Sequence, residues 1–261
     1  MKREIKQGTI IYGVRSTKYP ENKCYSIIIS ARCDVSNGKI EKLYYITALD
    51  VEEWLCTKKG FDIVYKKEIA SGIKNILDSK KINLSVLMEL SEDDKKQLLS
   101  QYKDSDQEKI LDFLNCDDVQ IRKKLIKKNS KVGYHFLRDI NESKQYHFFF
   151  LPELAYLENN RKDKGLIVDL QEIDYYIWDD IEKIKSPGID MMILDEEKDK
   201  YKVERWKEIF WLQDKDDFVD VERTIVSPWC ELLMQRFAID FIRIGVDRAS
   251  DKDLKSIIDR I

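Results

Sequence analysis

The sequence contains few residues that interrupt regular structure, with 4 prolines and 9 glycines among 261 residues. This scarcity argues against long flexible linkers between separate folded units. Hydrophobic residues make up 43% of the chain and charged residues 36%, a balance typical of a folded protein with a densely charged surface. The length suits one large domain, or a compact core that carries an insertion.

Long apolar runs are also missing, and none follows the basic residues near the N-terminus as it would in a signal peptide. The 46 basic and 49 acidic side chains nearly cancel, so no overall field attracts nucleic acid or anionic lipid. The five cysteines form no paired C-x-x-C units, which argues against a disulfide framework and a zinc knuckle. We therefore expect a cytoplasmic protein that does not bind membranes.

The sequence lacks the common catalytic and nucleotide-binding motifs, including the two glycine-rich phosphate loops, H-E-x-x-H and G-x-S-x-G. Two histidines are too few for a histidine-rich metal site. Several acidic residues lie close together in the sequence, but 49 acidic residues produce such clusters by composition, so a solvated face is the favoured interpretation. These residues are Asp169, Glu172, Asp174, Asp179 and Asp180. We expect no cofactor and no metal, and the sequence favours a non-enzymatic role.

One catalytic alternative stays open around Cys33 and Asp34, which follow a predicted buried strand. A Cys33 thiolate with His135 or His147 as its base would make a thiol or hydrolytic enzyme. A structural cysteine and a turn-forming aspartate are the simpler interpretation, because nothing in the sequence brings these residues together.

The strand pattern predicts an α+β fold with a β-rich core, either a small barrel or a meander sheet. Alternating and β-branched residues predict strands at residues 9–14, 24–31, 43–49, 146–151, 166–170, 191–194, 201–206 and 218–225. Asn37-Gly38 predicts a tight turn, and Pro152 should end the strand before it. The expected division is a β core at 1–67 and 132–226, a helical insertion at 68–131, and C-terminal helices at 227–261.

Helix signals support the insertion and the C-terminal helices. Ser91 is a candidate N-cap, and Ser105 to Glu108 has the pattern of a capping box. Ser227-Pro228 predicts a closing helix with Pro228 in its first turn, ending near Gly245. One apolar stripe should pack this helix on the sheet: Trp229, Leu232, Leu233, Phe237, Phe241 and Ile244. Ser250 predicts the start of a last short helix.

Two groups of residues are candidate binding surfaces. The densest basic stretch would contact phosphate groups if it lay on one helix face: Arg122, Lys123, Lys124, Lys127, Lys128 and Lys131. Its alternative is an ordinary solvated helix face. The aromatic residues Trp206, Phe210 and Trp211 are either core residues or a partner-binding patch.

Three segments of the sequence carry a resemblance: Ile27 to Val35 with the letters IIISARCDV, Phe150 to Glu153 with Val168 to Leu170, and the segment from Ser227-Pro228-Trp229 through Gln235-Arg236-Phe237-Ala238 to Gly245. Together they resemble an uncharacterised bacterial family of small β-barrel proteins. The resemblance implies an accessory component of mobile multi-gene conflict systems, including phage defence, without an established activity. The sequence departs from the family pattern at Ala238-Ile239-Asp240, where a more basic stretch is expected.

The leading functional hypothesis is an adaptor or sensor subunit of a bacterial multi-component system. It would act through protein–protein contacts, with the helical block as the interaction surface and a partner encoded by a neighbouring gene. The alternatives are a nucleic-acid-binding accessory component and a cryptic thiol or hydrolytic enzyme.

Overall fold

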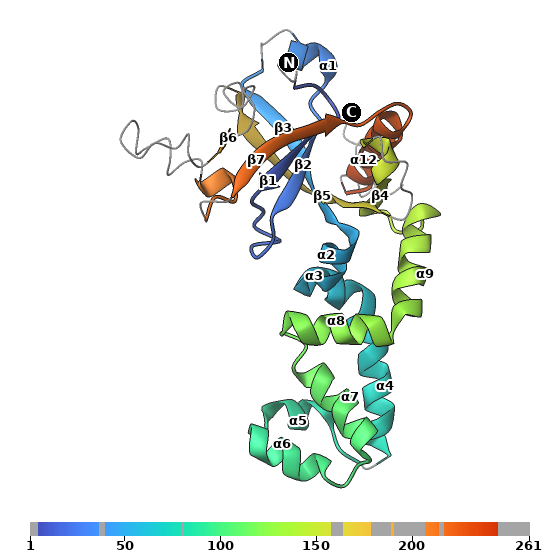
Figure 1. Cartoon of the computed structure of the whole chain (residues 1–261). Helices are drawn as coiled ribbons and strands as arrows, with labels where there is room; N and C mark the ends of the chain where they lie inside the picture. Colours follow the sequence, from blue (N-terminus) through green and yellow to red (C-terminus); the bar gives the residue numbers. More distant parts are fainter. Residues whose placement is uncertain are drawn as a thin grey trace, which may run out of the picture.

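The computed structural model describes residues 5–36, 40–79, 81–157, 164–178, 189–190, 207–213 and 217–244. It shows an α+β protein in which a sheet and a group of helices lie end to end (Figure 1). The predictions for residues 37–38, 191–194, 201–206 and 250–261 lie outside the described residues.

The strands form one antiparallel sheet with the order β4-β5-β3-β2-β1-β7-β6. Their bounds are β1 Thr9–Val14, β2 Cys24–Ile28, β3 Lys42–Asp50, β4 Phe148–Pro152, β5 Gly165–Ile177, β6 Ile189–Asp190 and β7 Phe218–Thr224. The meander of β1, β2 and β3 is confirmed, and β4 ends at Pro152 as predicted. The barrel alternative is wrong, because no ladder within the described residues joins β4 to β7 or β6.

Alternation along the strands divides the buried side chains between the two sheet faces. Ile46 and Ala48 of β3 point to one face, which α12 (Trp229–Ile244) covers through Cys230 and Leu233. Leu43 and Tyr45 point to the other face. Because both faces are covered by other elements, the sheet stays open without leaving its apolar residues in water.

Helices fill the long connection between β3 and β4, and we call residues 51–141 the helical arm. It contains α2 Val51–Cys56, α3 Lys58–Phe61, the π-helical turn η1 Asp62–Lys66, α4 Lys67–Asp78, α5 Leu84–Glu89, α6 Glu92–Leu99, α7 Asp104–Leu114, α8 Val119–Lys128 and α9 Ser130–Asn141. The arm projects from one end of the sheet, with α5 and α6 farthest from it (Figure 1). It extends beyond the predicted 68–131 in both directions.

The sequence did not predict the first helices of the arm, because their residues include many aromatic and β-branched side chains, which favour strands locally. Trp54, Phe61 and Tyr65 are nevertheless buried in one apolar cluster together with Leu49 of β3 and Ile167 of β5. The arm and the sheet therefore share a continuous core at their junction.

Two predicted helix starts differ from the structure, and one agrees. The Ser91 hydroxyl caps α6 by accepting a hydrogen bond from the Asp94 amide at 3.3 Å. The capping box at Ser105 is wrong, because α7 starts at Asp104 with Lys103 as its N-cap. Helix α12 starts at Trp229, so Pro228 precedes the first helical residue instead of occupying it. Leu232, placed in the buried stripe, is exposed, whereas Cys230 is buried.

Two short helices complete the described elements, α1 Arg32–Ser36 and the 3-10 turn η2 Glu153–Ala155. The first of them contradicts the prediction that Cys33 and Asp34 end a core strand. Strand β2 stops at Ile28, and both residues lie exposed on α1.

Candidate partner-binding groove

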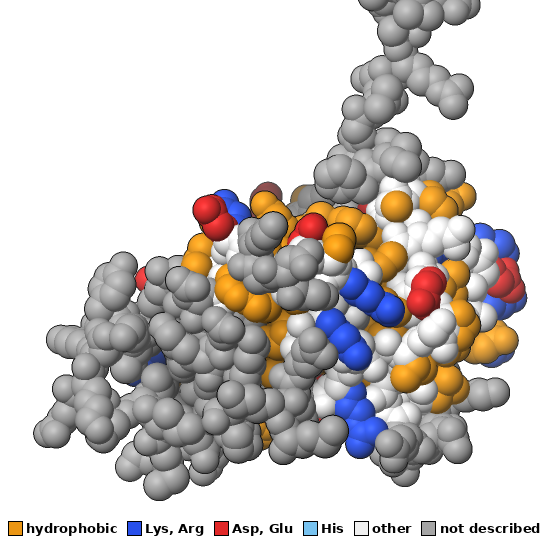
Figure 2. All heavy atoms as spheres, turned by 90° about the horizontal axis from the view of Figure 1, so that it is seen from above, with side chains coloured by type: hydrophobic (Ala, Val, Ile, Leu, Met, Phe, Trp, Pro, Cys, Tyr) orange, Lys and Arg blue, Asp and Glu red, His pale blue; other side chains and the backbone are white. Residues whose placement is uncertain are grey.

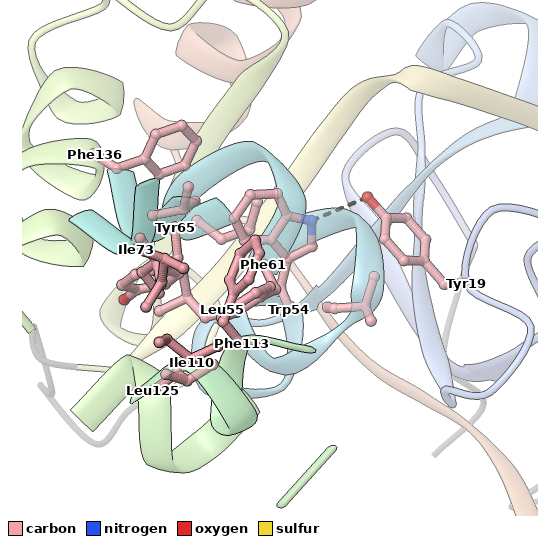
Figure 3. Close-up of a cluster of buried hydrophobic side chains, with 14 of the residues drawn as sticks. Tyr19, Trp54, Leu55, Phe61, Tyr65, Ile73, Ile110, Phe113, Leu125 and Phe136 are labelled. Carbon is pink, nitrogen blue, oxygen red and sulfur yellow. Dashed lines mark hydrogen bonds between the residues drawn. The ribbon is translucent and has the colours of Figure 1, made fainter. Parts of the chain in front are cut away.

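A buried polar network fixes the start of the arm against the sheet. The Trp54 indole Nε1 donates a hydrogen bond to the Tyr19 hydroxyl at 3.0 Å (Figure 3). That hydroxyl donates to Asp169 Oδ2 at 2.8 Å. Lys59 pairs with the same carboxylate, which is 1% exposed. The Gln171 amide donates to Asp169 Oδ1 at 3.2 Å. Each buried polar group thus has a partner, which such a site requires.

Beside this network lies a groove of about 740 Å³ between α2, α8 and the β1–β2 loop. Its apolar lining comes from Leu55 and Cys56 on α2 and from Val119 and Ile126 on α8. Val119 is 41% exposed, and Ile126 is half-buried. An apolar lining that water reaches is the usual feature of a protein-binding surface.

The two sides of the groove carry opposite charges. Glu52 and Glu53 belong to α2, whereas Lys123 and Lys127 belong to α8. Burial raises the pKa of Glu53, Asp50 raises it further, and Lys123 opposes the rise. Within the described residues, neither Lys123 nor Lys127 forms an ion pair closer than 4 Å. Their charges are available to a bound segment.

The structure separates the predicted basic stretch into residues with different roles. Arg122 is 4% exposed and joins α8 to two other segments of the arm through hydrogen bonds. Its Nε donates to the Cys56 carbonyl at 2.7 Å, and its Nη1 donates to the Cys116 and Asp117 carbonyls at 3.0 and 2.7 Å. Buried in this way, Arg122 cannot reach a phosphate backbone.

The remaining lysines of the stretch divide into two sets. Lys124 bridges to Glu108 and Asp112 at 2.8 Å each, and Lys128 reaches the same two acids at 3.1 and 3.4 Å. These pairs hold α8 against α7. Lys123 and Lys127 line the groove, and Lys131 is exposed on α9.

The catalytic candidates do not form one site. Cys33 and Asp34 lie on α1 at the end of the sheet away from the arm, and His135 is exposed on α9 within the arm (Figure 1). The Cys33 thiol contacts its neighbour Asp34 at 3.4 Å. His147 pairs through Nδ1 with Asp240 of α12 at 3.0 Å. No described hydrogen bond joins Cys33 to either histidine.

The aromatic candidates also separate. Phe210 is fully buried and stacks on Tyr176 with ring centroids 5.8 Å apart. Trp211 is half-buried, and the Arg15 guanidinium lies 5.6 Å from the centre of its ring. Trp206 lies outside the described residues. Phe210 is thus a core residue, and Trp211 lines a separate cavity.

The acidic cluster of the sequence does not converge either. Asp169 belongs to the buried network, and Glu172 pairs with Lys18 at 2.7 Å. Among the described residues, no three His, Cys, Asp or Glu side chains are arranged to hold a metal ion. Asp179 and Asp180 lie outside that part of the chain.

The groove includes residues that the sequence did not single out as a binding surface. Glu52, Glu53 and Leu55 fall in a segment predicted as β core, and Val119 precedes the basic stretch. The one local signal was the pair of acids directly before Trp54-Leu55.

The charges on the sheet end of the molecule are mixed, with acidic and basic side chains among apolar ones in the view from above (Figure 2).

No helix within the described residues has the length and apolar character needed to cross a membrane. Comparison with known proteins gives no relative: no family model, no curated protein and no solved structure matches the chain.

Proposed function

We propose that the chain is an adaptor subunit that binds a partner protein in the groove between α2 and α8. The observation that carries the proposal is the combination of an exposed apolar lining with opposite charges on its two sides. Val119 and Ile126 supply surface that gains free energy when it is covered. The proposal retains the expectation of a partner encoded by a neighbouring gene in a bacterial multi-component system, such as one for phage defence.

The charge arrangement specifies the occupant and its orientation. An amphipathic helix would place its apolar face on Leu55, Val119 and Ile126. Basic residues on one edge of that helix would meet Glu52 and Glu53, and acidic residues on the other would meet Lys123 and Lys127. The reversed helix would bring like charges together, so the two sides select one orientation.

The same charges favour a protein over a nucleic acid. A phosphate backbone that approached Lys123 would enter the groove that Glu52 and Glu53 also line, and like charges repel. Of the predicted basic stretch, Arg122, Lys124 and Lys128 are already engaged within the protein.

The rigid base of the groove supports this role. Trp54, one residue before Leu55, is fully buried and stacks on Phe136 with ring centroids 5.7 Å apart (Figure 3). Arg122 ties α8 to the end of α2 through the Cys56 carbonyl. Both walls are therefore fixed before a partner arrives, which lowers the entropy cost of binding.

The experiment is a titration of the purified chain with the products of its neighbouring genes. The double variant Lys123→Glu with Lys127→Glu, and separately Val119→Asp, should weaken binding by about tenfold or more. The matched control is Lys131→Glu, an exposed lysine of α9 outside the groove, and it should bind as the unaltered chain does. Circular dichroism verifies that each variant is folded.

Two results would contradict the proposal. One is unchanged affinity in both groove variants. The other is a chain that binds no neighbouring gene product and elutes as a monomer when mixed with each of them.

A further inference from the structure

A second cavity, of about 700 Å³, lies between the β1–β2 loop, strands β3 and β5, and residues 207–213. This volume lies within the range of roughly 300–1,000 Å³ that small-molecule sites occupy. This cavity is separate from the groove between α2 and α8, because the two share no lining residue among those that the structure describes.

One wall of the cavity is held in place by main-chain hydrogen bonds. The Arg15 amide donates to the Ile209 carbonyl at 2.9 Å, and the Trp211 amide donates to the Gly13 carbonyl at 2.8 Å. Phe210, between them, pairs with Val14 and is buried. Two main-chain hydrogen bonds and one isolated bridge thus attach residues 209–211 to the end of β1, beside the cavity.

Among the described residues that line the cavity, Arg15 is the one basic residue. Its guanidinium lies over the Trp211 ring, and its buried Nε has no hydrogen-bond partner within the described residues. A guanidinium placed over an aromatic ring by cation–π attraction can still donate hydrogen bonds to a carboxylate or phosphate. A buried donor without a partner is uncommon in native structures, and the other guanidinium nitrogens belong to a side chain that lines the cavity.

Two acids, Asp174 and Glu208, line the same cavity. Neither comes within 4 Å of a described basic nitrogen, so they do not neutralise Arg15. Asp174 Oδ1 accepts a hydrogen bond from the Tyr175 amide at 2.8 Å. The partly exposed ring of Tyr175 adds aromatic surface, and Lys42 lies 4.1 Å from the centre of that ring.

We infer that this cavity binds a small zwitterion of the amino-acid or short-peptide class, with an aromatic or apolar side chain. The ligand carboxylate would meet Arg15, its ammonium would meet Asp174 or Glu208, and its side chain would lie against Trp211 and Tyr175. A phosphate ester is disfavoured, because two acids face the same space as the one arginine and would repel a second negative charge.

The test is calorimetric titration of the full chain with defined probes. L-Tryptophan, L-tyrosine and L-leucine represent free amino acids, and leucyl-tyrosine represents short peptides. Whichever of these two classes of probe binds more tightly identifies the ligand as a free amino acid or a short peptide. L-Tryptophan amide lacks the carboxylate and N-acetyl-L-tryptophan lacks the ammonium, so each should bind about tenfold or more weakly than the parent. Adenosine monophosphate is the phosphate probe and should bind more weakly than the best zwitterion.

Variants connect each ligand charge to one residue. Arg15→Ala should weaken the binding of L-tryptophan by about tenfold. The same substitution should leave the affinity for L-tryptophan amide unchanged, because the amide has no carboxylate for Arg15 to bind. Asp174→Asn together with Glu208→Gln should weaken L-tryptophan and leave the N-acetyl form unchanged. Glu68→Gln, an exposed residue of α4, is the control. Unchanged thermal unfolding without ligand shows that each variant is folded.

The inference is overturned if no zwitterion binds at about 10 mM, if Arg15→Ala leaves L-tryptophan binding unchanged, or if adenosine monophosphate binds more tightly than every zwitterion. The groove variant Lys123→Glu with Lys127→Glu should retain full ligand binding, so this result and the fate of the proposed function are independent.

Discussion

The Trp54 indole donates a hydrogen bond to the Tyr19 hydroxyl at 3.0 Å, which joins the first helix of the arm to the loop between β1 and β2. The same loop contributes Arg15, Ser16, Thr17 and Pro20 to the lining of the 700 Å³ cavity, and Glu21 and Asn22 to the groove between α2 and α8. The position of this loop therefore defines the shape of both sites.

Tyr19→Phe should lower the free energy of unfolding by about 1–3 kcal/mol, because the buried Trp54 N–H loses its acceptor and Asp169 loses a donor. Asp169 keeps Lys59 as a partner, which limits the loss. Urea denaturation measures the change. Tyr134→Phe is the control, since this tyrosine is 64% exposed on α9. Equal stability of the two variants would show that the network contributes nothing.

Two helical glycines should respond in opposite directions to alanine. A Cβ atom on Gly133 of α9 would lie 2.1 Å from the Tyr65 hydroxyl, whereas one on Gly72 of α4 meets nothing within 4 Å. We expect Gly133→Ala to destabilise the chain by about 1–3 kcal/mol through overpacking. Gly72→Ala should stabilise it by about 0.5–1 kcal/mol through helix propensity. Thermal unfolding distinguishes the two.

The Gly133 clash can be tested further with Tyr65→Phe, which removes the hydroxyl that the new methyl group would meet. The double variant should recover part of the stability lost in Gly133→Ala, because the next nearest atom, Tyr65 Cζ, is 3.1 Å away. Strictly additive losses would show that the two residues do not interact.

The cysteines should differ in their reaction with a thiol reagent. Burial raises the pKa of Cys24 to about 12 and also raises the pKa of Cys230, so neither forms a thiolate readily. Cys33 is exposed on α1. We expect Cys33 to react first, Cys24 and Cys230 to react only as the chain unfolds, and Cys33→Ser to remove the fast phase. A fast phase that survives this substitution would contradict the exposure pattern.

The strands were the most predictable part of the fold, because their local pattern and their burial agree. β1 and β7 lie where alternation predicts them, and Pro152 ends β4 because it cannot donate to the ladder. The helix starts were less predictable. Ser105 has the sequence of an N-cap, which would start the helix at Asp106, but α7 begins two residues earlier at Asp104, and Asp104 and Asp106 both lie in its first turn near the positive end of the helix dipole.

The candidate sites could not be read from the sequence, because they depend on partners that are distant in the chain. In the sequence, Arg122 cannot be distinguished from the lysines beside it. In the fold, its Nε donates a hydrogen bond to the Cys56 carbonyl, which is 66 residues away in the chain. Lys124 is likewise engaged by Glu108 of α7. The sequence shows only that these residues are basic, whereas the fold shows which of them already bind carboxylates or carbonyls within the protein.

Glu108 makes the contact between α7 and α8 sensitive to pH. Hydrogen bonds from Lys124 and Lys128 lower the pKa of its carboxyl below the usual value. A lowered pKa in the folded state means that the ionised form is favoured by folding. This contribution is fully present above the pKa of an unfolded glutamate, about 4.3, and it is lost as the pH falls through the lower folded value.

Glu108→Gln should therefore lower the melting temperature at pH 7, and its effect should shrink as the pH falls through the lowered pKa of the folded-state carboxyl, because the protonated side chain no longer carries the charge that the lysines bind. The effect should be smaller than that of Tyr19→Phe, because exposed ion pairs are screened by water. Added salt at pH 7 should shrink the difference further. Glu68→Gln on α4, with no ion pair within the described residues, should show no such pH dependence. A Glu108→Gln deficit that stays constant over the whole acid range in which the chain remains folded would mean that the side chain acts through packing and not through its charge.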